Sequence, residues 1–362
     1  MSIVANHPSL TIYQQQPLNA GTPLDLLLRS FLTPPQLFFI RSHGTIPQID
    51  AQSYRLMISG MVQHPLVLTL DELRSRFPEH TVTATLQCTG SRRDELMKVR
   101  PIPNEVPWRA DAISTALWRG VLLRDVLQQV SIDGDASYAL FTGLDEVHKE
   151  GQQVGFGCSI SLQKALTSDV LLAYAMNEEP LAPEHGFPLR AIVPGYIGAR
   201  NVKWLHSIML QNQPSNNYFQ IHDYKLFPSN VTEENVDWNQ GVPIEEIPLN
   251  AVICIPREGE VVKQGQLCVQ GYAITGQNPP LTKVELSIND GKSWLPATIT
   301  HKSGPFAWCF WEASIDANPG ELEIITRAWD SSQHTQPANV SQLWNLGGYA
   351  NDAWHRVKVH VK

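Results

Sequence analysis

Apolar and polar residues alternate with two different periods along this chain. In the first part, LTLDELRSRF (68–77) begins at a Thr/Asp cap and continues as an amphipathic turn, and GVLLRDVLQQV (120–130) has the apolar spacing of a helix face. Short apolar runs in the same part, such as SYALFTGL, predict strands. The pattern therefore predicts a first part that mixes helices with strands.

The pattern changes near residues 230–248, where VDWNQGVPIEEIPLN forms a polar connection interrupted by prolines. Almost everything after it has the two-residue period of strands, as in ELEIITRAWD and HRVKVHV. The dipeptide Asp290-Gly291 predicts a hairpin turn after the strand TKVELSIND. In that strand we expect an inward apolar face and an outward polar face, formed respectively by Val284, Leu286 and Ile288 and by Lys283, Glu285 and Ser287.

Chain length supports the same division. A chain of 362 residues exceeds the size at which one hydrophobic core usually stops growing, and its 43% of hydrophobic residues suffices for two cores. We therefore expect an α+β fold, with a mixed domain over residues 1–240 and an all-β sandwich over residues 241–362. The second domain falls in the size range of immunoglobulin-like modules.

Composition and charge narrow the classes of partner. The formal net charge is −8 and the pI is about 5.8, and no sustained Lys/Arg stripe is present, so a nucleic-acid partner is not expected. The N-terminus has no signal-peptide or twin-arginine pattern, and no apolar run approaches about 18 residues, so we expect no membrane span and a cytoplasmic location. The five cysteines are odd in number and form no CxxC pair, which indicates a reducing compartment.

One of these cysteines, Cys88 in TLQCTGSRR, lies within a few residues of two adjacent arginines. Nearby cations stabilise a thiolate, which is either a nucleophile or a metal ligand. On bare frequencies a single strand cysteine is a small buried hydrophobe roughly two times in three. A cysteine hydrolase would also need a histidine base, for which His43, His185 and His206 are all candidates. A single thiolate cannot hold a metal alone, so the metal interpretation requires a large anionic cofactor bound elsewhere in the chain.

Basic residues placed among glycines and aromatics supply candidate contacts for such an anion. FFIRSHG (38–44) and EHGFPLRAIVPGYIGARNVKWL (184–205) both have this composition. Arg and Lys suit a phosphate, and glycines let backbone N–H groups approach it. Each segment alone is compatible with a solvated charge or a tight loop, so the prediction depends on their combination.

Together these segments resemble the sulfite oxidase family of molybdenum enzymes. The resemblance rests on TLQCTGSRR, AISTALWRGVLLRDVL, AYAMNEEPLAPEHGFPLRAIVPGYIGARNVKWL and the closing DAWHRVKVHV, in the family's order and with similar spacing, from about residue 38 to the C-terminus. It implies a mixed α+β domain that holds molybdenum on a molybdopterin dithiolene. It also implies a following immunoglobulin-like dimerisation domain, and hence a homodimer.

The resemblance implies roles for individual residues. Cys88 matches the cysteine whose thiolate ligates molybdenum, and Tyr224 in HDYKLF matches a tyrosine near the metal's oxo group. Arg41, Arg93 and Trp108 match residues of the substrate pocket. The implied contacts to the pterin and its phosphate fall on Phe39, Ile40, Arg41, Ser42, His43, Asp145, His185, Arg190, Asn201, Val202 and Lys203.

The activity implied by the resemblance is oxygen-atom transfer from the metal, with sulfite oxidised to sulfate. The two electrons must then pass to a separate acceptor such as cytochrome c or oxygen. We expect no haem cofactor, because the residues before 38 are too few for a haem domain and no HPGG-like or CxxCH motif occurs.

Two positions depart from the family pattern. Ser91 stands where the family's cysteine loop usually has an asparagine. Gly347, in WNLGGYANDAWHRV, stands where sulfite oxidases usually have an anion-binding arginine. Eukaryotic nitrate reductases share the domain pair and also lack that arginine, so a second expectation is a relative acting on another oxyanion or on an S- or N-oxide. A non-catalytic cofactor carrier or interaction protein is the remaining alternative, and the joint presence of Cys88, Arg41 and Tyr224 argues against it.

Overall fold

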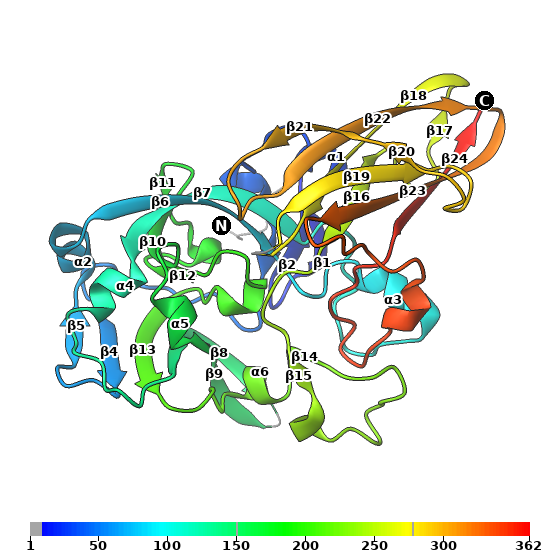
Figure 1. Ribbon diagram of the computed structural model, residues 1–362. Helices are drawn as coiled ribbons and strands as arrows, with labels where there is room; N and C mark the ends of the chain where they lie inside the picture. The colour runs from blue at the N-terminus through cyan, green and yellow to red at the C-terminus, as the bar shows by residue number, and fades with distance from the viewer. Residues whose placement is uncertain (1–8, 150, 277–278) are drawn as a thin grey trace.

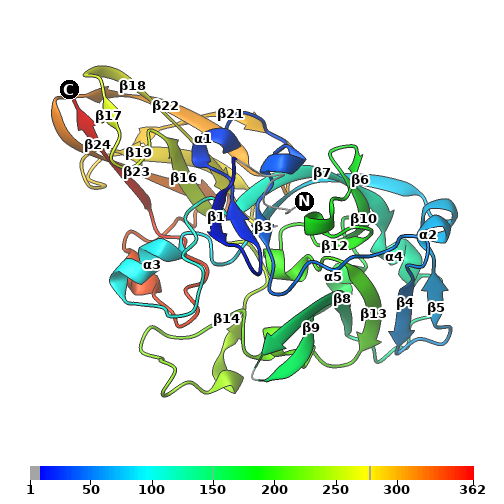
Figure 2. The same ribbon diagram turned by 180° about the vertical axis from the view of Figure 1, so that it is seen from behind.

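Strands make up most of the regular structure of this protein (Figures 1 and 2). The computed structural model describes residues 9–149, 151–276 and 279–362. The α-helices in these ranges are short, and none is long and apolar enough to cross a bilayer. They are α1 (Leu24–Leu27), α2 (Leu70–Arg76), α3 (Arg93–Val99), α4 (Leu123–Leu127), α5 (Leu162–Ala165) and α6 (Tyr218–Ile221). Single turns of 3-10 helix are η2 (Pro35–Leu37), η3 (Pro183–His185), η4 (Gly198–Arg200), η5 (Trp238–Gln240) and η6 (Val340–Leu343).

The first part of the chain forms three sheets and a short ribbon. A small sheet has the order β1 (Thr11–Gln14), β2 (Asn19–Gly21) and β3 (Ile40–Arg41). A second sheet has the order β11 (Glu179–Pro180), β10 (Leu171–Met176), β7 (Ile113–Leu122) and β6 (Glu79–Gln87), with β12 (Arg190–Ile192) also paired to β10. The third has the order β5 (Leu66–Leu68), β4 (Leu56–Gly60), β13 (Leu205–Gln211), β8 (Tyr138–Lys149) and β9 (Gln152–Ser161). The ribbon pairs β14 (Lys225–Leu226) with β15 (Val242–Pro243).

The second part consists of two sheets that lie together at one end of the molecule (Figure 1). One has the order β16 (Asn250–Ile255), β18 (Gly265–Ile274), β22 (Cys309–Ala317) and β21 (Thr298–Lys302). The other has the order β17 (Val261–Val262), β24 (His355–Val361), β23 (Gly320–Asp330), β19 (Leu281–Ser287) and β20 (Leu295–Pro296). Side chains of both sheets, including Val269, Leu286 and Trp311, share one buried apolar cluster. The change of period near residues 230–248 therefore marks a change from mixed sheets to paired sheets.

The two predicted helices have different outcomes. Thr69 caps α2 through a capping box with Glu72, so the predicted helix at 68–77 is confirmed. The segment 120–130 contains only the short α4, because residues 120–122 continue β7 and pair with β10. This strand is buried against neighbours on both sides, and a continuous apolar run fits either a buried strand or a helix. The prediction was wrong for those residues because periodicity alone does not separate the two.

The predicted hairpin at Asp290-Gly291 is confirmed. Both residues have positive φ, 55° and 76°, and β19 pairs antiparallel with β20 across the turn. The expected outward position of Ser287 is wrong, because its side chain is buried. Its hydroxyl oxygen accepts hydrogen bonds from the backbone N–H of Asn289 and of Gly291. Ser287 thus stabilises the turn from inside.

A buried arginine joins the two parts of the chain. Arg92 has no exposed surface, and its Nη1 donates to Asn250 Oδ1 at 2.9 Å and to the Ala353 carbonyl at 2.7 Å. It also forms an ion pair of 2.7 Å with Glu95. Tyr272 of β18 donates to the Ala110 carbonyl across the same boundary. The turn that follows Cys88 is therefore fixed in place by the second part of the chain.

Candidate active site

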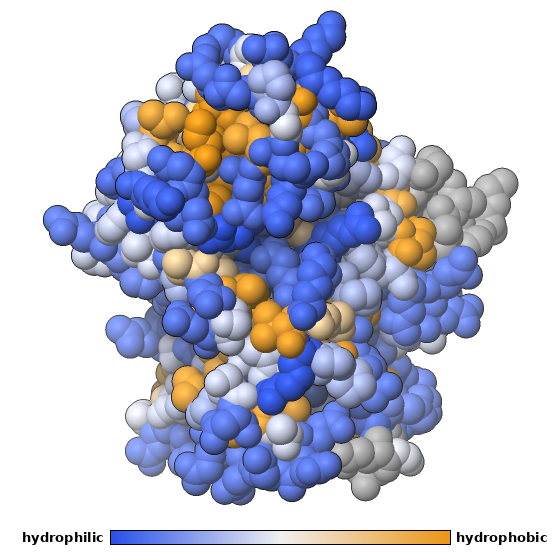
Figure 3. All heavy atoms as spheres, turned by 90° about the vertical axis from the view of Figure 1, so that its right-hand side faces the viewer, coloured by the Kyte–Doolittle hydropathy of each residue, from blue (hydrophilic) through white to orange (hydrophobic). Residues whose placement is uncertain are grey.

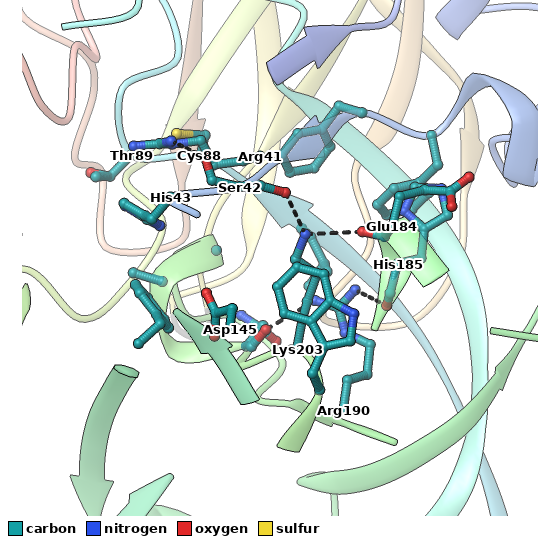
Figure 4. Close-up of a pocket in the computed structure, with 18 of the residues that line it drawn as sticks. Arg41, Ser42, His43, Cys88, Thr89, Asp145, Glu184, His185, Arg190 and Lys203 are labelled. Carbon is teal, nitrogen blue, oxygen red and sulfur yellow. Dashed lines mark hydrogen bonds between the residues drawn. The ribbon is translucent and has the colours of Figure 1, made fainter. Parts of the chain in front are cut away.

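The largest group of predicted site residues surrounds one cavity. Figure 4 shows Cys88, Thr89 and Arg41 on one side of it, and Asp145, Lys203 and Arg190 on another. The cavity lies where the small sheet, the end of β6, the segment after β12 and the segment before β14 meet. The predicted residues on its wall are Phe39, Arg41, Ser42, His43, Cys88, Asp145, His185, Arg190, Asn201, Lys203 and Tyr224.

Four predicted residues do not line this cavity. Ile40 is buried with Leu10 in the small N-terminal cluster, and Val202 is buried in the main core. Trp108 is fully buried and belongs to the same apolar cluster as Cys88. Arg93 is also buried, and its guanidinium binds backbone carbonyls and a carboxylate, as described below.

Other wall residues were missed by the sequence analysis. Most of them are apolar or small, and a residue of this kind has no chemical signature that distinguishes a cavity wall from a core. Glu184 and Trp204 lie inside the basic, glycine-rich segment 184–205, so that segment was the available signal. The missed residues are Phe38, Leu86, Thr89, Phe156, Glu184, Gly198, Ala199 and Trp204.

The thiol of Cys88 follows directly on the last residue of β6. Its backbone N–H donates to the Ala112 carbonyl at 2.9 Å, and its carbonyl accepts from Ser91 N at 2.9 Å, which starts a turn. This turn leaves 7% of Cys88 exposed. The chain approaches the thiol closely from the other side, since a Cβ atom at Gly198 would lie 3.1 Å from the Gln87 carbonyl oxygen. The backbone therefore holds the thiol at the cavity wall with little freedom.

The two arginines after the thiol carry compensated charges. Arg93 forms an ion pair of 2.9 Å with Glu105, and its Nε donates to the Gly347 carbonyl at 3.0 Å. Arg92 pairs with Glu95. Within residues 9–149, 151–276 and 279–362, no group of three His, Cys, Asp or Glu side chains is placed to hold a metal ion. A metal bound at Cys88 would therefore need further ligands from a cofactor.

Two buried cations face the cavity from the other side. Lys203 Nζ donates to Ser42 Oγ at 3.1 Å and to the Glu184 carbonyl at 2.9 Å. Arg190 donates to the carbonyls of His185 and Asn201, and its Nε has no hydrogen-bond partner among the described residues. Neither cation forms an ion pair with a carboxylate in that part of the chain. Their hydrogen-bond partners are neutral oxygens, while the carboxylates of Asp145 and Glu184 act on the charge of Lys203 electrostatically without forming an ion pair with it.

Burial shifts the pKa values of these groups strongly. It lowers the pKa of Lys203 to about 7 and the pKa of Arg190 to about 9, and the positive charge of Arg190 lowers that of Lys203 further. Burial also raises the pKa of Asp145 to about 6, against the opposing effect of Lys203. Burial in this site disfavours the charged forms of Lys203 and Arg190, and a bound anion would stabilise those charged forms again. The donor set fits a phosphate group at this side of the cavity.

The loop between these two cations is held by Asn201. Its Oδ1 accepts from Val193 N at 2.7 Å, and its Nδ2 donates to the carbonyls of Tyr196 and Ile197. The loop also uses Gly195 at φ 82°, a conformation that glycine adopts without strain. The side chain of Asn201 thus shapes the wall from behind, while its carbonyl fixes Arg190.

Tyr224 and His43 form a buried hydrogen-bonded pair of 2.7 Å between the hydroxyl and Nε2. Burial lowers the pKa of His43 well below its usual value, and burial raises the pKa of Tyr224 well above its usual value. Both groups are therefore neutral near pH 7, so the tyrosine hydroxyl donates and Nε2 accepts. Tyr224 has φ 52°, an uncommon conformation for an aromatic residue that often marks a functional position.

We expect sulfate to raise the melting temperature of the ligand-free protein more at pH 6 than at pH 8.5. Lys203, with a pKa of about 7, is mostly charged at pH 6 and mostly neutral at pH 8.5, whereas sulfate remains a dianion at both. Anion binding at the higher pH must first take up a proton, which weakens it. Thermal unfolding with and without sulfate measures the difference. In a Lys203→Gln variant the difference should shrink to the part that Asp145 contributes as it ionises above its pKa of about 6, and equal shifts at both pH values in the parent would contradict the assignment.

Comparisons with known proteins place both parts of the chain in described families. A family model described as "Oxidoreductase molybdopterin binding domain" matches residues 43–219, and one described as "Mo-co oxidoreductase dimerisation domain" matches residues 242–362. The sulfite oxidase of Gallus gallus is 41% identical over 97% of this chain and 78% of its own length. The sulfite oxidase of Arabidopsis thaliana is 40% identical over 98% of this chain and 95% of its own length.

Two further proteins show the breadth of the similarity. Nitrate reductase [NADH] 1 of Oryza sativa subsp. japonica is 36% identical over 99% of this chain and 42% of its own length. Among solved structures, the sulfane dehydrogenase SoxCD of Paracoccus pantotrophus superposes with a TM-score of 0.81 at 25% identity. That superposition covers 98% of this chain and 89% of the SoxCD chain. The similarity therefore extends over both parts of the chain.

Proposed function

The chain belongs to the sulfite oxidase family of molybdenum enzymes, and from this premise we propose that it oxidises sulfite to sulfate at the cavity lined by Cys88. It is an oxidoreductase that uses molybdenum on molybdopterin. One observation carries the proposal: a single cavity contains both a thiol and buried cations that form no ion pair with a carboxylate among the described residues. This combination suits a cofactor with a metal at one end and a phosphate at the other.

The residues of the cavity divide between those two ends. Cys88 would ligate the metal, and Lys203 and Arg190 would hold the phosphate. When bound, the cofactor supplies the oxygen atom and accepts the two electrons of sulfite oxidation. The protein contributes a fixed thiol, compensating positive charge and a cavity wall rich in aromatic residues.

Arg41 and Tyr224 would act on the substrate. Arg41 lines the cavity on the same side as Cys88 and has no carboxylate partner among the described residues, so its charge is available to an anion (Figure 4). Tyr224 keeps its proton and donates a hydrogen bond to His43 Nε2, which fixes the direction of the hydroxyl group. Arg93 and Trp108, which lie off the cavity wall, would instead shape the region behind Cys88.

The electrons would leave to a separate acceptor, cytochrome c or oxygen, without a haem in this chain. The working division of the chain is a molybdopterin-binding domain over residues 1–240 and an immunoglobulin-like sandwich over residues 241–362. The two facing sheets and their shared apolar cluster support the sandwich.

Reduction of another oxyanion or of an oxide is a second candidate function. Two observations favour it: Gly347 has no side chain to offer an anion, and the charge of Arg93 is compensated by Glu105. The positive field near Cys88 then depends on Arg41. A rice nitrate reductase matches nearly the whole chain. Such a weak positive field near Cys88 is compatible with a larger or less charged substrate than sulfite.

Metal analysis and a substrate screen test the proposal together. Purified protein should contain molybdenum near one atom per chain, and sulfite should reduce ferricyanide or cytochrome c in its presence. If molybdenum-loaded protein does not oxidise sulfite but reduces nitrate or an S-oxide with a viologen donor, the result favours the second function. Protein without molybdenum after expression in a host that makes the cofactor overturns both.

We expect the full chain to be a homodimer that associates through its second part. Figure 3 shows apolar side chains gathered over this part of the molecule and framed by polar ones. Val261 and Leu295, on the edge strands β17 and β20, are 56% and 45% exposed. These two residues lie at opposite edges of one sheet, so it is the gathered apolar surface seen in Figure 3 that is of the kind that marks association sites. Light scattering at micromolar concentration should give twice the 40.5 kDa of one chain, and a monomer would count against the proposal.

A further inference from the structure

The side chain of Asn19 supports two cations of the cavity although it lies before the segment that the molybdopterin family model matches. Asn19 is fully buried at the start of β2, where it pairs with Arg41 of β3. Its Oδ1 accepts from Arg41 Nη1 at 3.2 Å and from Ser42 N at 3.1 Å. Ser42 in turn accepts from Lys203. One amide oxygen therefore contacts Arg41 directly and Lys203 through Ser42.

The hydrogen-bond network assigns the amide orientation. The Nδ2 group of Asn19 donates to Gln14 Oε1 at 2.9 Å and to the Pro17 carbonyl at 3.1 Å. Acceptors thus lie on one side of the amide and donors on the other, so both halves of the amide are used. An aspartate would present a second acceptor to the Pro17 carbonyl, and an apolar residue would leave the donors unsatisfied. The site is built for a neutral amide.

The charge of Arg41 sets it apart from the other arginines near the thiol. Arg92 and Arg93 are each paired with a glutamate, whereas Arg41 Nη1 binds only Asn19 Oδ1 and the Ser42 carbonyl, both neutral. Its Nε and Nη2 make no hydrogen bond with the described residues, and Arg41 lines the cavity. These two neutral acceptors therefore hold the Arg41 guanidinium in place without compensating its charge.

From this arrangement we infer that Asn19 is a positioning residue for anion binding, which orients Arg41 toward the cavity while leaving its positive charge available. The inference rests on the proposed function, since it deepens the account of how the substrate anion is held. The hairpin of β1 and β2, seen beside β3 in Figure 2, is then part of the active site and not only of its scaffold.

Replacement by aspartate tests the charge directly. In an Asn19→Asp holoenzyme the new carboxylate would pair with Arg41, so the KM for sulfite should rise on the order of tenfold or more while kcat changes little. In the holoenzyme, where the cofactor would occupy Lys203 and Arg190, the rise in melting temperature that sulfate causes should shrink in parallel, and this readout needs no turnover. An Asn19→Ala variant, which removes the acceptor but adds no charge, should raise KM by only a few-fold.

Asn177→Asp is the matched control. The Asn177 amide likewise joins backbone groups, accepting from Leu117 N and donating to the Thr33 carbonyl, and it has no hydrogen bond to a cation of the cavity. The Asn177→Asp variant should leave the KM for sulfite and the sulfate-induced rise in melting temperature unchanged. If the Asn19→Asp protein does not fold, Asn19→Ala decides: a raised KM supports the role and an unchanged KM overturns it.

Three results overturn the inference. They are unchanged KM and sulfate shift in both Asn19 variants, equal effects of aspartate and alanine, and the same loss in the Asn177→Asp control. A parent protein that does not oxidise sulfite is a different failure. It rejects the proposed substrate, and the sulfate shift of the variants still tests the positioning role.

Discussion

We expect a Cys88→Ser variant to keep its fold, while its turnover number falls by more than about 100-fold. The backbone of Cys88 is held by Ala112 and Ser91, so its position does not depend on the sulfur. A hydroxyl is a harder and weaker ligand than a thiolate toward molybdenum, whereas the cations proposed to hold the phosphate lie on another side of the cavity. The variant should therefore still bind the pterin. Steady-state kinetics, with pterin and molybdenum analysis of the same sample, measure both effects.

Cys309→Ser provides the matched control. Cys309 is buried in the apolar cluster of the second part, where no cavity residue contributes. This variant should lose some stability and keep its turnover number. Undiminished oxygen transfer by Cys88→Ser, or an equal loss in both variants, would contradict the ligand role of Cys88.

Gly347→Arg should lower the free energy of unfolding by on the order of 3 kcal/mol. A Cβ atom at Gly347 would lie 2.3 Å from a ring carbon of Tyr349, so the new side chain and this ring compete for the same space. The Tyr349 ring is buried, stacks on Tyr224 at 5.6 Å and lies 5.1 Å from the Arg93 guanidinium. The substitution therefore disturbs both neighbours. Gly347 does not have positive φ, so the conflict is one of space and not of backbone conformation.

Removing the competing ring should relieve this conflict, so Gly347→Arg should cost less stability in a Tyr349→Ala background than in the parent, although Tyr349→Ala itself removes a buried ring. In Gly347→Arg combined with Tyr349→Ala the arginine gains room, and the KM for sulfite should then fall by about ten- to a hundredfold, the value of one charge-assisted contact. Gly134→Arg is the control, because nothing lies within 4 Å of a Cβ atom there. Chemical denaturation of the parent, both single variants, the double variant and the control measures the stabilities. A stable Gly347→Arg variant, or an equal cost of Gly347→Arg in the parent and in the Tyr349→Ala background, would contradict the competition between these positions.

The sequence predicted the strand-rich second part well because its signals are local. The turn at Asp290-Gly291 and the two-residue period of β23 and β24 depend on neighbouring residues only. Residues 120–122 were misassigned because a buried strand and a helix share the same apolar run. Ser287 was misplaced because its inward position depends on hydrogen bonds to the turn that follows it.

The candidate site was predictable where a residue's chemistry is distinctive. Cys88, Lys203 and Arg190 stand out as a thiol and as basic residues among glycines, and the structure brings them to one cavity. Asn19 could not be found in this way, because an asparagine near a proline is common and its importance arises from distant contacts. The charge of Arg93 was also beyond sequence reasoning, since its pairing with Glu105 becomes visible only in the fold.

The rate of ferricyanide reduction by the molybdenum-loaded protein, measured against sulfite concentration, tests the central claim most directly. The account predicts saturable turnover, with one sulfate formed for every two ferricyanide ions reduced. It also predicts a high KM that rises with added sulfate or chloride, because Arg41 alone supplies an uncompensated charge near the thiol. No reduction with sulfite, together with efficient viologen-driven reduction of nitrate or an S-oxide by the same sample, would contradict the assignment of sulfite as substrate.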